Sequence, residues 1–142
     1  RDGDGVPLES KWTNGPRTFI GMMVDDFPNM FMIMGPHAAL GNNPRSIEYN
    51  VEWISNIIDF IRDKNLTTAE APITAVDDWH EFVSTKAEGL LSNDVDSWMT
   101  GINLNVKGKQ VRTIVRYTGT APEYRARCDE VAKNNFEELI LY

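Results

Sequence analysis

The stretch Phe27–Trp53 constrains the fold of this chain more than any other part of its sequence. Its run Met30–Met34 is apolar at every position, as expected for a strand buried on both faces. Gly35-Pro36 then marks a turn, and a short polar loop leads into an amphipathic helix that we expect to begin near Pro44. Loops between the carboxyl end of a strand and the amino end of a helix are where α/β folds bind nucleotides. The stretch therefore predicts an α/β domain with a nucleotide-type site at this loop.

The predicted helix carries its apolar side chains at spacings of four and three, which places them on one stripe: Ile47, Val51, Ile54, Ile58 and Ile61. Asn43 suits the N-cap, because its side chain can accept a hydrogen bond from a free N–H group of the first turn. Pro44 suits the first helical position, where no N–H donor is needed. We expect Lys64-Asn65 to end this helix.

The remaining segments alternate between strand and helix patterns. We expect strands at Arg17–Val24 and Gln110–Tyr117, and a short last strand at Glu137–Tyr142. The capping-box patterns Thr74-x-x-Asp77 and Thr120-x-x-Glu123 start two further helices. The resulting order, β-β-α-α-β-α-β, indicates an α/β domain or a piece of one.

Charge and composition exclude several classes of function. The 142 residues carry a formal net charge of −7, which argues against a general nucleic-acid binder. No apolar run is long enough to cross a membrane. Cys128 is the only cysteine, so no disulfide can form within the chain, and we expect a cytoplasmic protein. His37 and His80 lie in different predicted elements, so we expect no metal site, and Cys128 is expected to be a small buried residue rather than a nucleophile.

The loop of residues 35–45 holds the candidate binding residues. Gly35 and Gly41 permit close approach of the backbone to a ligand. Free N–H groups at the start of the helix favour an acceptor atom or a developing negative charge. The alternative is an ordinary connection with a well-capped helix. Three polar side chains of the loop accordingly face either a ligand or solvent: His37, Asn42 and Arg45.

Two features further along the chain have two interpretations each. Trp98 stands among small and polar residues, where an aromatic side chain forms either a stacking lid over a planar ligand or a wedge between domains. Basic side chains gather in one segment, where they either meet a phosphate or are solvated: Lys107, Lys109, Arg112 and Arg116.

Four segments, in this order, resemble the Baeyer–Villiger flavin monooxygenases. They are the opening from Arg1 to Gly21, the stretch FPNMFMIMGP with NNPRSIEYNVEWI, the segment Ser97–Asn103 with Gly108-Lys109, and the segment Tyr124–Ala132. The third is similar to the family pattern S-W-x-x-G-x-N-(I/V)-P-G-K and the fourth to Y-R-x-x-C-D-E-(I/V)-A. The third departs from its pattern, because Asn105 stands where the family has Pro and two extra residues precede Gly108. Together the four segments span nearly the whole chain.

The resemblance implies an enzyme that uses FAD, NADPH and O2 to insert one oxygen atom into a ketone, which gives an ester or a lactone. It implies that Trp98 lies in a loop close to the NADP and the substrate. It also implies FAD contacts at the turn beneath the flavin ring and at the pyrimidine end of the ring: Gly35, Pro36, Asn42, Asn43 and Pro44.

The same resemblance implies a C-terminal fragment. The sequence contains no G-x-G-x-x-G phosphate loop, so we expect part of a flavoprotein with two dinucleotide-binding domains, inactive alone and with its catalytic residues in the rest of the protein. Residues 1–65 would end the FAD-binding domain, and residues 66–142 would pack against the FAD and NADP domains. The expected partners are a ketone, O2 and the remainder of its own chain, without nucleic acid or membrane. The alternatives are a related monooxygenase that oxidises nitrogen or sulfur, and a non-catalytic interaction module.

Overall fold

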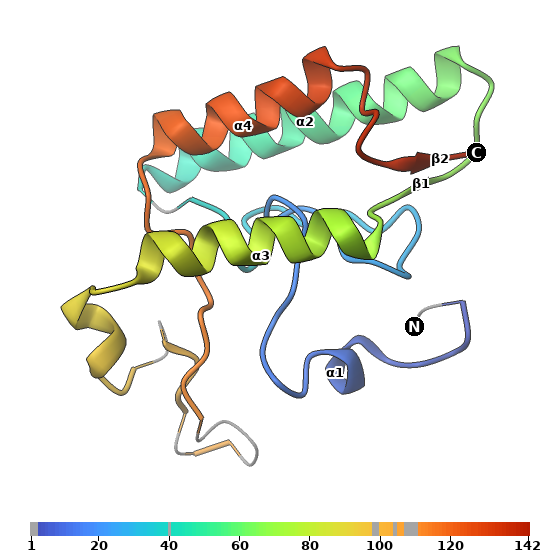
Figure 1. The fold of residues 1–142 in the computed structure, drawn as a ribbon. Coiled ribbons are helices and arrows are strands. Elements are labelled where there is room, and N and C mark those ends of the chain that lie inside the picture. The colour runs from blue at the N-terminus through green and yellow to red at the C-terminus, as the bar shows by residue number, and fades with distance from the viewer. Residues whose placement is uncertain (1–2, 40, 98–99, 104, 107–110) are drawn as a thin grey trace.

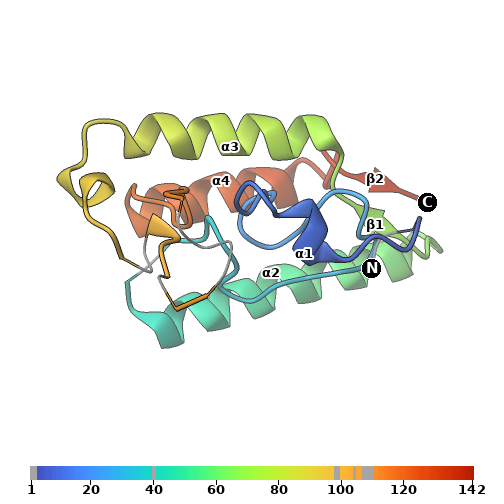
Figure 2. The ribbon, with the colours of Figure 1, turned by 90° about the horizontal axis from the view of Figure 1, so that it is seen from below.

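The structure is a computed structural model that describes residues 3–39, 41–97, 100–103, 105–106 and 111–142. Its longest elements are the helices α2 (Asn43–Asp63), α3 (Ile73–Ala87) and α4 (Ala121–Lys133). The shorter elements are helix α1 (Leu8–Lys11), the 3₁₀-helix η1 (Leu91–Asp94) and the antiparallel strands β1 (Ala69–Glu70) and β2 (Ile140–Leu141). Helices α2 and α4 run side by side, and the loops that connect α1 to α2 lie beneath this pair and beside α3 (Figures 1 and 2).

The α/β prediction holds only in part. Within the described residues, helices dominate and the one two-stranded sheet is formed by β1 and β2. Strand β2 falls inside the predicted strand Glu137–Tyr142, but the predicted strands Arg17–Val24 and Met30–Met34 are not strands. In the predicted strand Gln110–Tyr117, the described part is not a strand and makes a single parallel bridge, from Tyr117 to Ala39.

The segment Arg17–Val24 reverses direction instead of continuing as a strand. Phe19 N donates to Met23 O at 2.8 Å, and Met23 N donates back to Phe19 O at 3.1 Å. Between them Ile20 and Gly21 have φ angles of +44° and +70°. The turn is buried. Its apolar composition therefore reflects burial and not strand pairing.

The segment Met30–Met34 lacks the neighbours that its composition predicted. Its main chain is anchored at two points, where Met32 N donates to Met22 O at 2.8 Å and Met34 N donates to Asn50 Oδ1 at 3.0 Å. Ile33 is 50% exposed, so the run is not buried on both faces. A strand of that kind needs layers on both sides, and the described residues cover one side.

Helix α2 begins close to the predicted position but has a different N-cap. Asn42, and not Asn43, is the cap, because Asn42 Oδ1 accepts a hydrogen bond from Arg45 N at 3.1 Å. Pro44 lies in the first turn as predicted.

The buried face of α2 differs in part from the predicted stripe, of which Ile61 is buried as predicted. Its buried residues are Asn50, Trp53, Ile57 and Ile61, whereas Ile47, Val51 and Ile58 are between 42% and 48% exposed. Both sets follow helical spacing, so periodicity alone could not decide between them. A hydrogen bond across to α4 identifies the buried stripe, because Trp53 Nε1 donates to Cys128 O at 2.9 Å.

The two later helices are confirmed. Thr120 caps α4 as predicted, with its Oγ1 accepting from Glu123 N at 3.3 Å. The capping box proposed at Thr74 is wrong, because α3 begins at Ile73 and its N-cap, Pro72, has no side chain that could accept a hydrogen bond. The contact of α4 with the loops is anchored by Tyr124, whose hydroxyl donates to Ile20 O at 2.7 Å and so fixes the buried turn.

Candidate functional site

The Gly35-Pro36 turn packs on the buried turn around Gly21 with no room for a side chain at either glycine. A Cβ on Gly35 would lie 2.5 Å from Gly21 O, and a Cβ on Gly21 would lie 2.6 Å from Ala38 N. The φ of +70° at Gly21 also favours glycine. The close approach that Gly35 permits is therefore to the protein's own backbone, which holds residues 35–38 in place.

The start of α2 presents an open backbone corner. Gly41 has a φ of +149°, and a Cβ there would meet nothing within 4 Å. Asn42, Asn43 and Pro44 are exposed, and the side chain of Asn42 is engaged in capping. The first turn of α2 contains no acidic residue, so its N–H groups and the helix dipole keep their positive character. The corner suits an acceptor atom or a negative charge.

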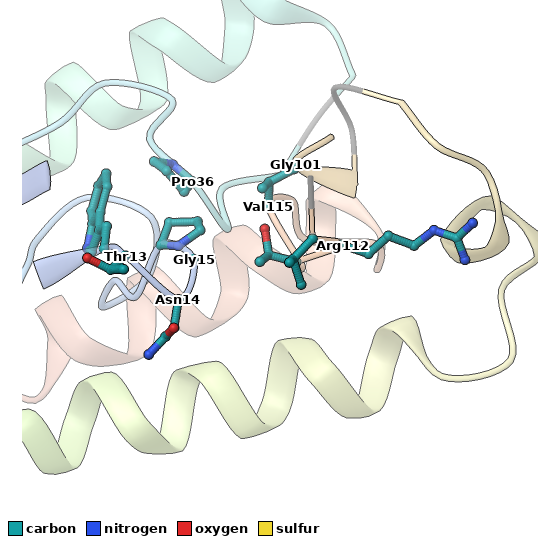
Figure 3. A pocket seen from close by; sticks show the side chains of 11 residues that line it. Thr13, Asn14, Gly15, Pro36, Gly101, Arg112 and Val115 are labelled. Carbon is teal, nitrogen blue, oxygen red and sulfur yellow. The ribbon is translucent and has the colours of Figure 1, made fainter. Parts of the chain in front are cut away.

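A cavity of about 410 Å³ lies beside the Gly35-Pro36 turn (Figure 3). Its walls come from three parts of the chain that are distant in sequence: residues 12–16, Pro36, and the positions 101, 111–113 and 115. Pro36 belongs to the predicted flavin turn, and Gly101 belongs to the segment that resembles the S-W-x-x-G-x-N pattern. The fold therefore brings these two motifs to one cavity.

Thr113 fixes one wall of this cavity. A Cβ on Gly15 would lie 2.9 Å from Thr113 Cγ2, and a Cβ on Gly101 would lie 2.4 Å from Thr113 Oγ1. Thr113 N also donates to Thr100 O at 2.8 Å. Both glycines are thus required by the same threonine, which leaves no space for side chains on either side of it.

Arg112 is held by its own chain and is turned away from the cavity. Figure 3 shows its side chain extending away from the other labelled residues. Its Nε donates to Asp96 Oδ1 at 2.8 Å and its Nη2 donates to Asp94 O at 2.8 Å. Of the two interpretations of the basic segment, the solvated one describes Arg112, whose side chain is 46% exposed and also anchors the segment to η1 and the residues after it. Lys107 and Lys109 lie outside the described residues.

His37 faces neither ligand nor solvent, so both interpretations of this side chain are wrong. It is completely buried, with Nε2 lying 2.7 Å from Ile114 O and Nδ1 lying 3.3 Å from Thr18 Oγ1. Burial lowers the pKa of His37 to about 4. The ring of His80 on α3 lies 5.5 Å away between centroids. Arg45 is exposed, as one of its two interpretations allowed.

Trp98, the residue predicted to contact NADP and substrate, lies outside the described residues. The ends of its segment are held: Ile102 N donates to Ser97 O at 3.0 Å, and Thr100 Oγ1 donates to Val95 O at 2.8 Å. The described residues on either side of Trp98 are therefore held by hydrogen bonds, and Gly101 among them lines the cavity.

Sequence reasoning missed several residues that shape the site. It did not link residues 12–16 to Pro36, and it placed Gly21 and Thr18 in a strand. A glycine inside a strand-like run is a signal of close backbone approach, and Gly21 makes such an approach. This signal could have identified the contact.

The described residues give little support to a cysteine nucleophile, a metal site or a membrane-spanning helix. Burial raises the pKa of the Cys128 thiol to about 12, which keeps it protonated and unreactive, as expected for a small buried residue. No group of three or more metal-ligating side chains could hold an ion in this part of the chain. No described helix is both long and apolar enough to cross a membrane.

Comparisons with known proteins agree with the resemblance seen in the sequence. No family model matches the chain. It is 36% identical over 135 residues to cyclohexanone 1,2-monooxygenase of an Acinetobacter species, covering 95% of this chain and 24% of that protein. It is 34% identical over 138 residues to a phenazine N-monooxygenase of Lysobacter antibioticus, covering 97% of this chain and 25% of that protein.

Solved structures match equally well. The structure of cyclohexanone monooxygenase from Rhodococcus sp. Phi1 bound to NADP+ superposes with a TM-score of 0.92 at 29% identity, over 99% of this chain and 26% of that one. A crystal structure of an OTEMO complex with FAD and NADP superposes with a TM-score of 0.87 at 30% identity, over 100% of this chain and 27% of that one. The chain spans about a quarter of the length of these relatives. The predicted resemblance to Baeyer–Villiger flavin monooxygenases is confirmed, and the matching region of cyclohexanone monooxygenase is its C-terminal part.

Proposed function

We propose that this chain is the C-terminal part of an FAD- and NADPH-dependent monooxygenase that inserts one oxygen atom from O2 into a ketone to give an ester or a lactone. The observation that carries the proposal is the match to cyclohexanone monooxygenases over nearly every residue, in both sequence and fold. The single cysteine agrees with a cytoplasmic location. We expect the chain alone to be inactive, because the remaining three quarters of such a protein would carry the phosphate-binding loops and the catalytic residues.

The residues present fit one edge of a flavin. The open backbone at Gly41 leaves room for a planar ring, and the first turn of α2 offers N–H groups with positive character. In this proposal Asn42, Asn43 and Pro44 border the pyrimidine end, and Gly35 and Pro36 support the ring from beneath. FAD, when bound, supplies the redox chemistry that activates O2. The part of this chain is to orient the ring and to stabilise negative charge on it.

The cavity between Pro36 and Gly101 is the proposed meeting place of the flavin turn with the NADP and substrate loop. Its volume of about 410 Å³ falls within the range of small-molecule sites. Trp98, which lies outside the described residues, is the proposed contact to NADP and substrate.

The exposed apolar face of α2 supports the proposed division into two regions. Ile47, Val51 and Ile58 lie on one side of the helix, and Ile58 also lines an apolar groove of about 400 Å³ with Phe31 and Leu66. We propose that residues 1–65 complete an FAD-binding domain whose remainder covers this face, and that residues 66–142 pack against the FAD and NADP domains.

The experiment that tests the proposal uses the longer protein that contains this chain. It should be yellow from bound FAD, should oxidise NADPH faster when cyclohexanone is added, and should yield a product heavier by one oxygen atom. A colourless protein without flavin would overturn the proposal.

A charge substitution tests the role of the α2 corner. Asn43→Asp should lower the flavin midpoint potential, because a carboxylate there opposes negative charge on the reduced ring. An interaction of about 1 kcal/mol corresponds to about 20 mV for a two-electron couple. Asn56→Asp is the matched control, since Asn56 is exposed on the same helix and far from its start. Equal potentials in the two variants would contradict the assignment.

A second candidate is a flavin monooxygenase that oxidises nitrogen. The specific observation in its favour is the 34% identity to a phenazine N-monooxygenase, which is close to the identity with cyclohexanone monooxygenase. Product analysis by mass spectrometry on matched ketone and N-heterocycle panels decides between the two. An N-oxide without any ester or lactone would favour this second candidate.

A further inference from the structure

His37 is a buried ionisable residue to which the proposed function gives no role. It directly follows the Gly35-Pro36 turn and is 0% exposed. Its φ of +66° lies in the left-handed region, which is uncommon for residues other than glycine. Such a conformation persists only where surrounding contacts determine it.

Both the main chain and the imidazole of His37 bind the segment of residues 111–117. His37 N donates to Val115 O at 3.1 Å, and Nε2 lies 2.7 Å from Ile114 O. A carbonyl oxygen can only accept, so Nε2 carries the ring proton. One residue of the flavin turn therefore holds two successive carbonyl groups of this segment.

The other ring nitrogen reaches toward the buried turn. Nδ1 of His37 lies 3.3 Å from Thr18 Oγ1, and the Thr18 hydroxyl lies 2.9 Å from Pro36 O. With Nε2 protonated and the ring neutral, Nδ1 is an acceptor. The single proton of the Thr18 hydroxyl is then shared between Pro36 O and His37 Nδ1.

Burial, with a smaller effect of nearby charges, keeps the ring of His37 neutral. Burial is the main cause of its lowered pKa, and the charges of His80 and Arg17 lower it further. His80 approaches from α3, and Arg17 is paired with Asp77 of the same helix. The tautomer with a proton on Nε2 is thus the working form at neutral pH.

The segment bound by His37 is also a wall of the cavity. Val111, Thr113 and Val115 line it together with Pro36, and the same segment follows the loop that carries Trp98. His37 therefore contributes two hydrogen bonds to the contact between the flavin turn and this wall, next to the bridge from Ala39 to Tyr117.

We propose that His37 is a positioning residue which, through its neutral imidazole, ties the turn beneath the flavin to the segment that continues the NADP loop. This inference rests on the proposed function. Hydride transfer needs the reacting atoms about 3–3.5 Å apart, and a shift of about 1 Å can cost about 100-fold in rate. A residue that fixes the position of the flavin turn relative to the segment of residues 111–117 therefore acts on the rate of flavin reduction.

Two substitutions separate positioning from mere packing. His37→Leu removes both ring hydrogen bonds, and His37→Gln retains an N–H donor that can reach Ile114 O. In the longer flavoprotein, we expect His37→Leu to slow flavin reduction by NADPH about 10- to 100-fold with FAD content unchanged, and His37→Gln to recover most of the rate. Glu81→Gln, at an exposed position of α3, is the control and should leave the rate unchanged. If His37→Leu fails to fold, His37→Asn replaces it, because its side chain is too short to reach Ile114.

Unchanged flavin reduction in His37→Leu, or His37→Gln as slow as His37→Leu, would overturn the inference. Nitrogen NMR of the 142-residue chain provides a test that is independent of flavin. We expect the Nε2–H tautomer at His37 and no titration above about pH 5, and an Nδ1–H tautomer or titration near pH 6.5 would overturn the bridge itself. A longer protein without FAD would overturn the proposed function and the role of His37 toward the cofactor. The NMR result would still show whether His37 forms the hydrogen bonds to Ile114 and Thr18.

Discussion

Replacing Gly21 tests whether the Gly35-Pro36 turn depends on direct backbone contact. Gly21 and Gly89 have nearly the same backbone conformation, with φ angles of +70° and +73°. They differ in their surroundings, because a Cβ on Gly89 meets nothing within 4 Å, whereas a Cβ on Gly21 would lie 2.6 to 2.7 Å from N, Cα and Cβ of Ala38. The pair Gly21→Ala and Gly89→Ala therefore separates conformational strain from steric contact.

The expected magnitudes follow from these contacts. Gly89→Ala should cost about 1 kcal/mol, the usual penalty for alanine in the left-handed region. Gly21→Ala carries the same penalty and must also move Ala38 by about 1 Å to reach an ordinary contact, which adds about 1–3 kcal/mol of overpacking. That movement weakens the bonds from Ala38 N to Gly35 O and from His37 N to Val115 O, each 3.1 Å long and worth about 1 kcal/mol. We expect a total of about 3–5 kcal/mol.

The assay is urea unfolding of the 142-residue chain, followed by tryptophan fluorescence and far-UV circular dichroism. Coincident transitions with unchanged m-values allow the two free energies of unfolding to be compared. Gly21→Ala should be at least about 2 kcal/mol less stable than Gly89→Ala. Equal stabilities would refute the claim that the Gly35-Pro36 turn rests on Gly21.

Three further predictions concern acid stability, capping and the α2–α4 contact. The pKa of His37 is about 4 in the folded state and 6.5 in the unfolded state, so the unfolded state binds the proton more readily. The stability that the neutral ring contributes is therefore fully present above pH 6.5 and falls by about 3 kcal/mol as the pH drops to 4. Urea midpoints measured across this pH range should show a shallower slope for His37→Gln. Asn42→Ala should cost about 1 kcal/mol in thermal unfolding and Asn43→Ala under about 0.5 kcal/mol, because Asn42 is the cap, and the reverse order would contradict this assignment. Trp53→Phe removes the indole donor to Cys128 O and should cost about 1–2 kcal/mol in the same urea assay, whereas an unchanged midpoint would show that this bond contributes nothing.

The sequence predicted the helices better than the strands. Helix α2 and helix α4 carry local signals at their starts, namely an Asn-Asn-Pro sequence and a Thr-x-x-Glu capping box, and both begin within a residue of the predicted positions. Such signals depend only on neighbouring residues, which is why they can be seen without the fold.

The strand predictions were wrong because the apolar runs on which they rested report burial and not strand pairing. The run at Met30–Met34 and the turn around Gly21 are both apolar, but an apolar run is common to strands, buried turns and surfaces that a further part of a protein covers. The prediction of the buried face of α2 was partly wrong for a related reason. Two stripes fit the helical period, and the choice between them depends on the distant Cys128 of α4.

The candidate site was predictable as a set of motifs and not as a geometry. The order of the motifs indicated the relatives, and the start of α2 was expected to be either a ligand-binding loop or an ordinary connection to a well-capped helix. The cavity joins residues 12–16 to Pro36 and to residues 111–115, which no local pattern connects. His37 shows the same limit, because its partners Thr18 and Ile114 lie 19 and 77 residues away in sequence.

The central claim is that this chain forms the flavin-edge part of a ketone monooxygenase. The most direct measurement is the absorbance spectrum of the longer protein that contains it, recorded while NADPH and then cyclohexanone with O2 are added. The account predicts the spectrum of oxidised flavin, which NADPH should bleach. Cyclohexanone with O2 should then restore this spectrum while the lactone forms. A protein that contains no flavin, or whose flavin NADPH does not reduce, would contradict it.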